Sequence, residues 1–122
     1  DLKKMIGTCF YEDDIFIGTI AENIIAGNNE YSDKMIDVAE QLGLKEFIHS
    51  LPQGYDTVLI PENRKYPKTI IKKIVLARNI LKQPALLLIE NFLTIFEPAE
   101  IERITNYLLS AQHQWAVYFV SN

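Results

Sequence analysis

The chain has 122 residues, which is long enough to bury the core of one domain. Apolar residues make up 48% and charged residues 23%, an ordinary globular balance that argues against disorder. The formal net charge is −4 and no cluster of Lys and Arg occurs, which argues against a nucleic-acid partner. We interpret the pairs Lys3–Lys4 and Lys72–Lys73 as solvated faces.

Cys9 is the only cysteine, so an intramolecular disulfide and a cysteine-based metal cluster are both excluded. We expect Cys9 to be a small core residue. No apolar run approaches the roughly 20 residues of a membrane helix, and the N-terminus lacks the pattern of a signal peptide. A start at Asp1 suggests a piece of a longer protein. His49 and His113 have no metal-ligand spacing and are interpreted as surface residues.

The first half of the chain predicts one strand followed by short helices. The strand covers 5–10, and the acidic residues after it form a loop. Thr19 and Glu22 have the spacing of a capping box, which predicts a short helix that ends at Gly27. Further helices are expected over 33–42, between an N-cap at Ser32 and a stop at Gly43, and over 44–49. A turn follows at 53–56.

The second half predicts a long helix between buried strands. A polar stretch with prolines over 61–67 precedes a helix over 68–82 with a wide apolar face. Residues 85–89 are predicted to form a strand buried on both faces, as in a parallel sheet. Pro98 starts a helix that extends to about Ser110, and the last strand covers 115–120. This order of elements is typical of an α/β fold.

Four blocks of sequence, in order, resemble the exporter-type ABC transporter nucleotide-binding domain. Residues 16–24 (FIGTIAENI) are similar to the segment that follows the Q-loop in that family. Residues 51–57 (LPQGYDT) resemble its "LP-x-GYDT" loop, and 74–84 (IVLARNILKQP) the helix between the signature motif and Walker B. Residues 117–121 (VYFVS) resemble the strand before the switch histidine.

The resemblance implies the portion from the Q-loop to the switch region of that domain. The fold implied is a partial RecA-like P-loop NTPase core sheet with an inserted helical subdomain. The core-sheet portion would comprise 1–19 and 67–122, and the helical subdomain 20–66. ATP and Mg²⁺ are the cofactors implied. The phosphate-binding Gly-x-x-x-x-Gly-Lys-Ser/Thr motif does not occur in the chain, so we expect this part alone not to bind them. With part of the sheet missing, self-association is also expected.

Two motifs that handle ATP in the family are degenerate here. The resemblance places the Q-loop glutamine at Tyr11, whose phenol lacks the paired donor and acceptor of a carboxamide. It places the signature loop at 66–70, where Pro67 supplies neither a hydroxyl nor an N–H. We interpret Pro67 as a helix-starting residue. Lys68 and Thr69 complete the degenerate signature positions, and a contact of Lys68 with a phosphate stays open.

The positions of hydrolytic chemistry have also changed. Glu90 lies at the Walker B position and keeps a carboxylate that could hold Mg²⁺, although it is one methylene longer than aspartate. Asn91 replaces the catalytic glutamate, and an amide cannot accept a proton at neutral pH. Asn122 replaces the switch histidine and carries no titratable proton. No catalytic residue of the family is therefore intact.

The leading hypothesis is a degenerate, non-hydrolysing part of an ABC ATP-binding domain. Its partners would be the transmembrane domain of an exporter, contacted through 16–23, and a second nucleotide-binding domain. The location implied is cytoplasmic, at the inner face of the membrane. One alternative is the half-site of a heterodimeric ATPase that is active only with its upstream P-loop and a partner chain. Another is an interaction module on an ABC-like scaffold without transport.

Overall fold

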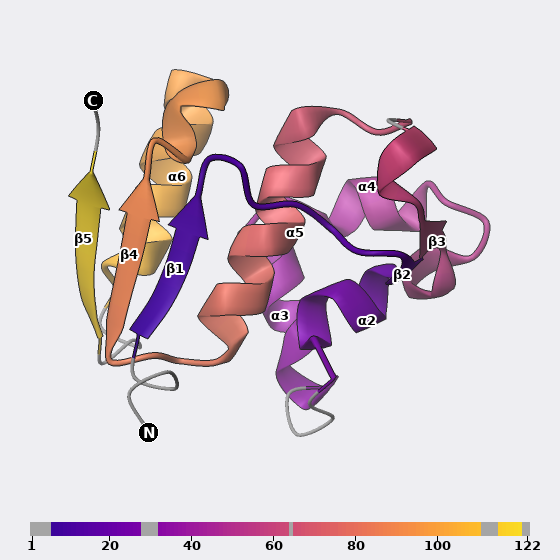
Figure 1. Cartoon of the computed structure of the whole chain (residues 1–122), viewed down its shortest axis with the longest axis horizontal. Coiled ribbons are helices and arrows are strands. Elements are labelled where there is room, and N and C mark those ends of the chain that lie inside the picture. Colours follow the sequence, from indigo (N-terminus) through magenta and orange to yellow (C-terminus); the bar gives the residue numbers. More distant parts are fainter. Residues whose placement is uncertain (1–5, 28–31, 64, 111–114, 121–122) are drawn as a thin grey trace.

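The computed structural model describes residues 6–27, 32–63, 65–110 and 115–120. A three-stranded sheet is formed by β1 (Ile6–Phe10), β4 (Leu86–Glu90) and β5 (Ala116–Val120), in the order β1-β4-β5. Both pairings are parallel, and the strands are joined by helical connections (Figure 1). The chain is therefore α/β with a parallel sheet, as the order of predicted elements indicated.

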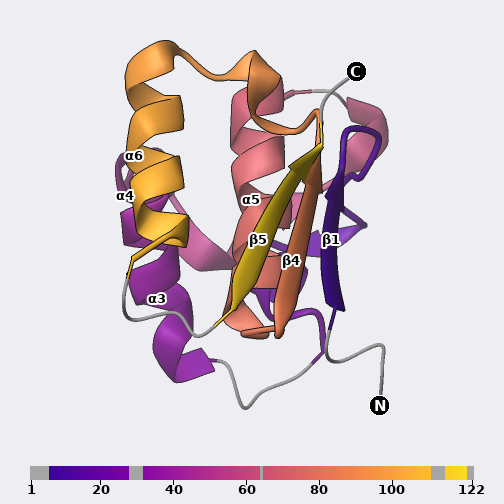
Figure 2. The same ribbon diagram turned by 90° about the vertical axis from the view of Figure 1, so that its left-hand side faces the viewer.

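One face of this sheet is covered by helices and the other is not. Figure 2 shows α5 (Lys68–Leu81) and α6 (Pro98–Leu108) on the same side of the strands. On that side Cys9, Leu87 and Ile89 are buried. The alternate residues of β4 are only half-buried, and Tyr118 beside them on β5 is 62% exposed. The prediction that 85–89 would be buried on both faces is wrong, because no described helix covers the second face.

The remaining helices lie on the side of α5 away from the sheet (Figure 1). They are α2 (Ile20–Ile25), α3 (Ser32–Gln41) and α4 (Lys45–His49). The side chain of Thr19 accepts from the backbone N–H of Glu22, and the Glu22 carboxylate accepts from the backbone N–H of Thr19, so the predicted capping box is confirmed. Helix α5 contacts α2, α3 and β1. It is therefore the central element between the sheet and the other helices (Figure 1).

A two-stranded antiparallel pair was not predicted from the sequence. Strand β2 (Gly18–Thr19) pairs with β3 (Val58–Leu59) and leads directly into α2. Single turns of 3₁₀ helix occur at η2 (Gly54–Asp56), η3 (Pro61–Asn63) and η4 (Leu93–Ile95). Segments of two or three residues are too short to produce a hydrophobic period, so the pattern of the sequence could not identify them. Within the described residues, no helix has the length and hydropathy to cross a membrane.

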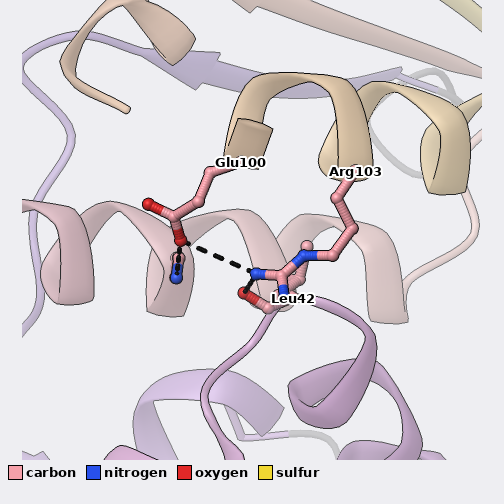
Figure 3. A network of polar contacts seen from close by, with 4 residues as sticks. Leu42, Glu100 and Arg103 are labelled. Carbon is pink, nitrogen blue, oxygen red and sulfur yellow. Dashed lines mark hydrogen bonds and ion pairs between the residues drawn. The ribbon is translucent and has the colours of Figure 1, made fainter. Parts of the chain in front are cut away.

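A polar network ties the end of α3 to α5 and α6. Lys73 on α5 forms an ion pair with Glu100 on α6; the Lys73 side chain is buried and that of Glu100 is half-buried. Arg103 Nη2 lies 3.6 Å from Glu100 Oε2 and donates to the carbonyl oxygen of Leu42 over 3.4 Å (Figure 3). The next residue, Gly43, has a φ of +80°, and a Cβ there would collide with the Arg103 guanidinium.

Replacing Gly43 with alanine is expected to destabilise the chain by about 2 kcal/mol, since a left-handed alanine costs about 1–2 kcal/mol and the guanidinium must also move. Gly27→Ala is the matched control, because Gly27 has a φ of +83° but no neighbour within 4 Å of the added Cβ. Denaturant unfolding followed by circular dichroism measures both. Equal losses in the two variants would show that the Arg103 contact contributes nothing.

Candidate functional site

The carboxyl ends of the parallel strands bring several predicted site residues to one edge of the sheet. Phe10, Glu90 and Val120 lie side by side in register. Tyr11 and Asn91 therefore follow neighbouring strands at the edge where α/β proteins place their ligands. Asn122, two residues beyond β5, lies outside the described residues.

Asn91 has a backbone role at this edge. Its φ is +49°, in the left-handed region that asparagine tolerates better than most residues. Its backbone N–H donates to Val120 O over 2.8 Å, and its carbonyl oxygen accepts from the Thr94 hydroxyl over 3.2 Å. The residue thus ends β4, fixes it to β5 and starts the turn into η4. A carboxamide at this point supplies hydrogen bonds but no base.

Glu90 points away from the helices. It alternates with the buried Ile89, so its side chain lies on the uncovered face of the sheet, on the side of Phe10 and Val120. Among the residues that the structure describes, no three Asp, Glu, His or Cys side chains come together to hold a metal ion. His49 is exposed, and His113 lies outside the described residues. The donor set of this part of the chain alone does not fit Mg²⁺, which needs several oxygen ligands.

The N-terminus of α5 contains the degenerate signature positions. Pro67 is the N-cap and makes no side-chain hydrogen bond to the helix; its carbonyl oxygen accepts from the backbone N–H of Ile70 and of Ile71. Lys68 is exposed and Thr69 half-buried. Pro67 thus begins α5 as its N-cap residue, which agrees with its interpretation as a helix-starting residue.

A cavity of about 380 Å³ brings the Q-loop and signature positions together. Tyr11 lies in its wall with Lys68, and Tyr66 contributes an aromatic ring. The remaining lining residues come from the connection after β1, the segment before α5 and the first turns of α5: Glu12, Asp13, Asp14, Ile15, Ile60, Pro61, Lys65, Ile71 and Lys72. Pro67, Thr69, Glu90 and Asn91 do not line it. The predicted site residues are thus divided between this cavity, the N-terminus of α5 and the edge of the sheet.

Lys72 and Lys73 are buried, contrary to their interpretation as a solvated pair. Their exposed fractions are only 7% and 5%. Lys73 reaches Glu100 on α6, and Lys72 turns to the connection after β1, where its Nζ donates to the carbonyl oxygens of Tyr11 and Asp13. Each ammonium has polar or charged partners, although these are distant in the sequence. Because of these partners, burying the ammonium costs less free energy than burying an isolated charge. Lys3 and Lys4 lie outside the described residues.

Arg78 and Asn23 form a second anchor of the same connection. Arg78 Nε donates to Asn23 O over 2.8 Å, and Arg78 Nη2 donates to Asn23 Oδ1 over 3.3 Å. The guanidinium also lies over the ring of Phe16, 5.2 Å from its centroid, and burial lowers the pKa of Arg78. The Asn23 carboxamide in turn accepts from the backbone N–H of Phe16 and donates to its carbonyl oxygen. Sequence reasoning missed the contact between these two residues; for Arg78, a charged side chain within a helix of apolar periodicity was the available signal.

No protein-family model matches the chain. Curated relatives nevertheless match most of it. ABC transporter B family member 7 of Dictyostelium discoideum is 36% identical over 89 residues, 72% of this chain and 11% of that protein. The ABC transporter ATP-binding protein YfiB of Bacillus subtilis is 36% identical over 91 residues, 74% of this chain and 16% of that protein. The ABC multidrug transporter mdr2 of Aspergillus fumigatus is 31% identical over 110 residues, 90% and 14% respectively. The chain therefore spans less than a fifth of each relative.

Among solved structures, a bacterial Atm1-family ABC exporter with ATP bound superposes with a TM-score of 0.86. The match covers 98% of this chain and 21% of the exporter chain, at 23% identity, and so concerns the fold. The parallel sheet with its helices is thus consistent with part of a P-loop NTPase core. With the sequence matches, this shows that the chain is homologous to a segment of ABC transporters of the exporter type.

Proposed function

We propose that this chain is part of an ABC exporter's nucleotide-binding domain and that it does not hydrolyse ATP. In this proposal 1–19 and 67–122 contribute to the core sheet, and 20–66 form the helical subdomain. Its role is to couple to, or dimerise within, an exporter whose transmembrane domain holds it at the cytoplasmic face of the membrane. ATP and Mg²⁺ are bound, if at all, with the help of residues outside this chain.

The observation that carries the proposal is the chemistry at the end of β4. The resemblance puts the residue that activates water at Asn91, and a carboxamide has no basic site near neutral pH. Its backbone is engaged with Val120 and Thr94, so the residue has a structural reason to be there. Pro67, in place of a serine at the start of α5, and Tyr11, in place of a glutamine after β1, support the same conclusion.

The surface around the β2–β3 pair supports a role in coupling. Phe16 and Ile17 precede β2, and Ile17 is 66% exposed. Val58 and Ile60, from β3 and the residue after it, are also exposed. Since β2 and β3 are paired, these four apolar side chains come from neighbouring backbone segments. Exposed apolar groups of this kind mark a protein contact. We propose that the transmembrane domain of the exporter contacts them.

Phosphate release from Mg-ATP is the test of the proposal. For this chain, or a longer protein that contains it, we expect less than about one hundredth of the rate of an ABC transporter whose Walker B strand ends in Asp-Glu, because a general base contributes about 10²–10⁴-fold. A phosphate assay with and without EDTA measures it. Magnesium-dependent turnover comparable to that transporter would overturn the proposal.

Titration calorimetry with Mg-ATP separates two forms of the same proposal. Binding by the longer protein but not by this chain would place the nucleotide site upstream, with this part as its scaffold. No binding by either would restrict the role to assembly. Micromolar binding by this chain alone would contradict the proposal, since the phosphate-binding Gly-x-x-x-x-Gly-Lys-Ser/Thr motif does not occur in the chain.

One observation favours a second candidate, the half-site of a heterodimeric ATPase. Glu90 keeps a carboxylate at the carboxyl end of β4, where the resemblance places the Walker B acid. In that case hydrolysis would appear only when a partner chain with an intact signature loop is added. It would then be lost in the Glu90→Gln variant of the longer protein. Absence of turnover in the mixture would favour the non-hydrolysing role.

A further inference from the structure

The segment between β1 and β2 is the first passage of the chain from the sheet to the helical elements. It leaves the sheet at Phe10 and enters β2 at Gly18. Local hydrogen bonds shape it: Asp13 N donates to Phe10 O over 3.0 Å, and Ile15 N donates to Asp14 Oδ1 over 2.7 Å. These bonds define the turn but do not fix it against the rest of the fold. We call residues 11–17 the connection.

Lys72 supplies a contact from outside the connection. It lies in the second turn of α5, and its ammonium donates to Tyr11 O and, over 2.8 Å, to Asp13 O. Two aromatic rings flank the same ammonium, that of Tyr11 at 5.2 Å and that of Phe92 at 5.4 Å from Nζ to centroid. Carbonyl oxygens and ring faces are both attractive to a cation. The ammonium is thus enclosed by groups that suit its charge.

The charges around this ammonium are of both signs. Burial lowers the pKa of Lys72, and Lys68 acts in the same direction. Asp14, Asp13 and Glu12, all in the connection, oppose that effect. The acidic residues of the connection therefore compensate a positive charge that would be costly in isolation. Lys72 is therefore attracted to the connection by opposite charge as well as by direct hydrogen bonds.

From these contacts we propose that Lys72 is a positioning residue, a tethered cation that fixes the connection to α5 and so holds the wall of the 380 Å³ cavity in place. The cavity is bounded on one side by the connection and on the other by the start of α5. Lys72 bonds the first to the second. This proposal is independent of nucleotide chemistry and of the function proposed above.

Lys73 offers a matched control on the same helix. It is buried to the same degree as Lys72 and carries the same charge, but it pairs with Glu100 and lies 5.9 Å from the ring of Phe96. Lys72→Met and Lys73→Met each remove one buried ammonium and keep most of the aliphatic stem. Only the first removes the contact with the connection.

Amide hydrogen exchange by NMR is the experiment. We expect the amides of Asp13 and Ile15 to exchange about 10- to 100-fold faster in Lys72→Met, the factor expected for lost hydrogen bonds to a charged donor. In Lys73→Met they should exchange as in the unaltered chain. Wild-type rates at these two amides in Lys72→Met, or equal acceleration in both variants, would overturn the proposal.

A second measurement on the unaltered chain covers the case in which Lys72→Met does not fold. The ammonium protons of Lys72 should exchange with water slowly enough to be observed by ¹⁵N NMR at neutral pH, whereas those of the exposed Lys68 should not. Equally fast exchange of both ammonium groups would contradict the enclosure of Lys72 and with it the proposal.

Discussion

Replacing Asn23 with alanine is expected to lower the free energy of unfolding by about 3 kcal/mol. The side chain is fully buried in α2, with an exposed fraction of 0%. Its Oδ1 accepts from Phe16 N over 2.9 Å, and its Nδ2 donates to Phe16 O and to Thr19 O, each over 3.0 Å. Alanine would remove the carboxamide from these part-buried backbone groups, and each buried group left unsatisfied costs about 1–3 kcal/mol.

Guanidinium denaturation followed by circular dichroism measures this loss. Asn106→Ala is the matched control, because Asn106 is exposed on α6 and the same change there should alter stability by less than about 0.5 kcal/mol. A loss below about 1 kcal/mol for Asn23→Ala would mean that water or a shift of the connection replaces the carboxamide.

The thiol of Cys9 is expected to be almost inert in the folded chain. Its exposed fraction is 0%, and burial in the sheet, with a smaller contribution from Asp13, raises its pKa to about 12. At pH 8 the folded chain would hold about 1000-fold less thiolate than a thiol with a pKa of 9.0, the ordinary value for cysteine. Since the thiolate is the nucleophile, reaction with a disulfide reagent should be slower by at least about this factor than in guanidinium.

Because Cys9 is the only cysteine, a colorimetric thiol assay at pH 8 reports on this residue alone. Complete reaction of the native chain within minutes would contradict the buried position. The same shift has a consequence for stability. The pKa of Cys9 is higher in the folded chain than in the unfolded chain. Titration of this thiol therefore leaves the free energy of unfolding unchanged below pH 9 and lowers it as the pH rises toward 12. Cys9→Ala should therefore lose less stability than the unaltered chain between pH 8 and pH 10.5.

The elements found from the sequence are those with a strong local pattern. The apolar face over 68–82, the capping box of Thr19 and Glu22, and the apolar run before Glu90 led to α5, α2 and β4 with nearly correct bounds. Each pattern depends on residues that are close in the chain. The strand order β1-β4-β5 and the β2–β3 pair depend on long-range contacts, which leave no local signal.

The site was harder to foresee for the same reason. Lys72 and Lys73 have their partners 27 to 61 positions away, so their charge alone suggested solvent. The resemblance assigned Tyr11 and Lys68 to different motifs, and only the folded chain shows that they share a cavity. Strand alternation predicts that Glu90 lies on the face opposite to Ile89. It does not predict which face of the sheet is without helices. The roles assigned to Tyr11, Pro67, Glu90 and Asn91 in handling ATP stay predictions.

Three positively charged side chains fix helix α5 to its neighbours. With about 100° between successive residues, Lys72, Lys73 and Arg78 project at roughly 0°, 100° and 240° around its axis. They reach the connection, α6 and α2 respectively. Any rotation of the helix about its axis, or a slip along it, would break at least one buried charged contact. We therefore expect α5 to move as a rigid body when the sheet and the helical elements move relative to each other. Bending is then confined to the segments that join α5 to the rest of the chain.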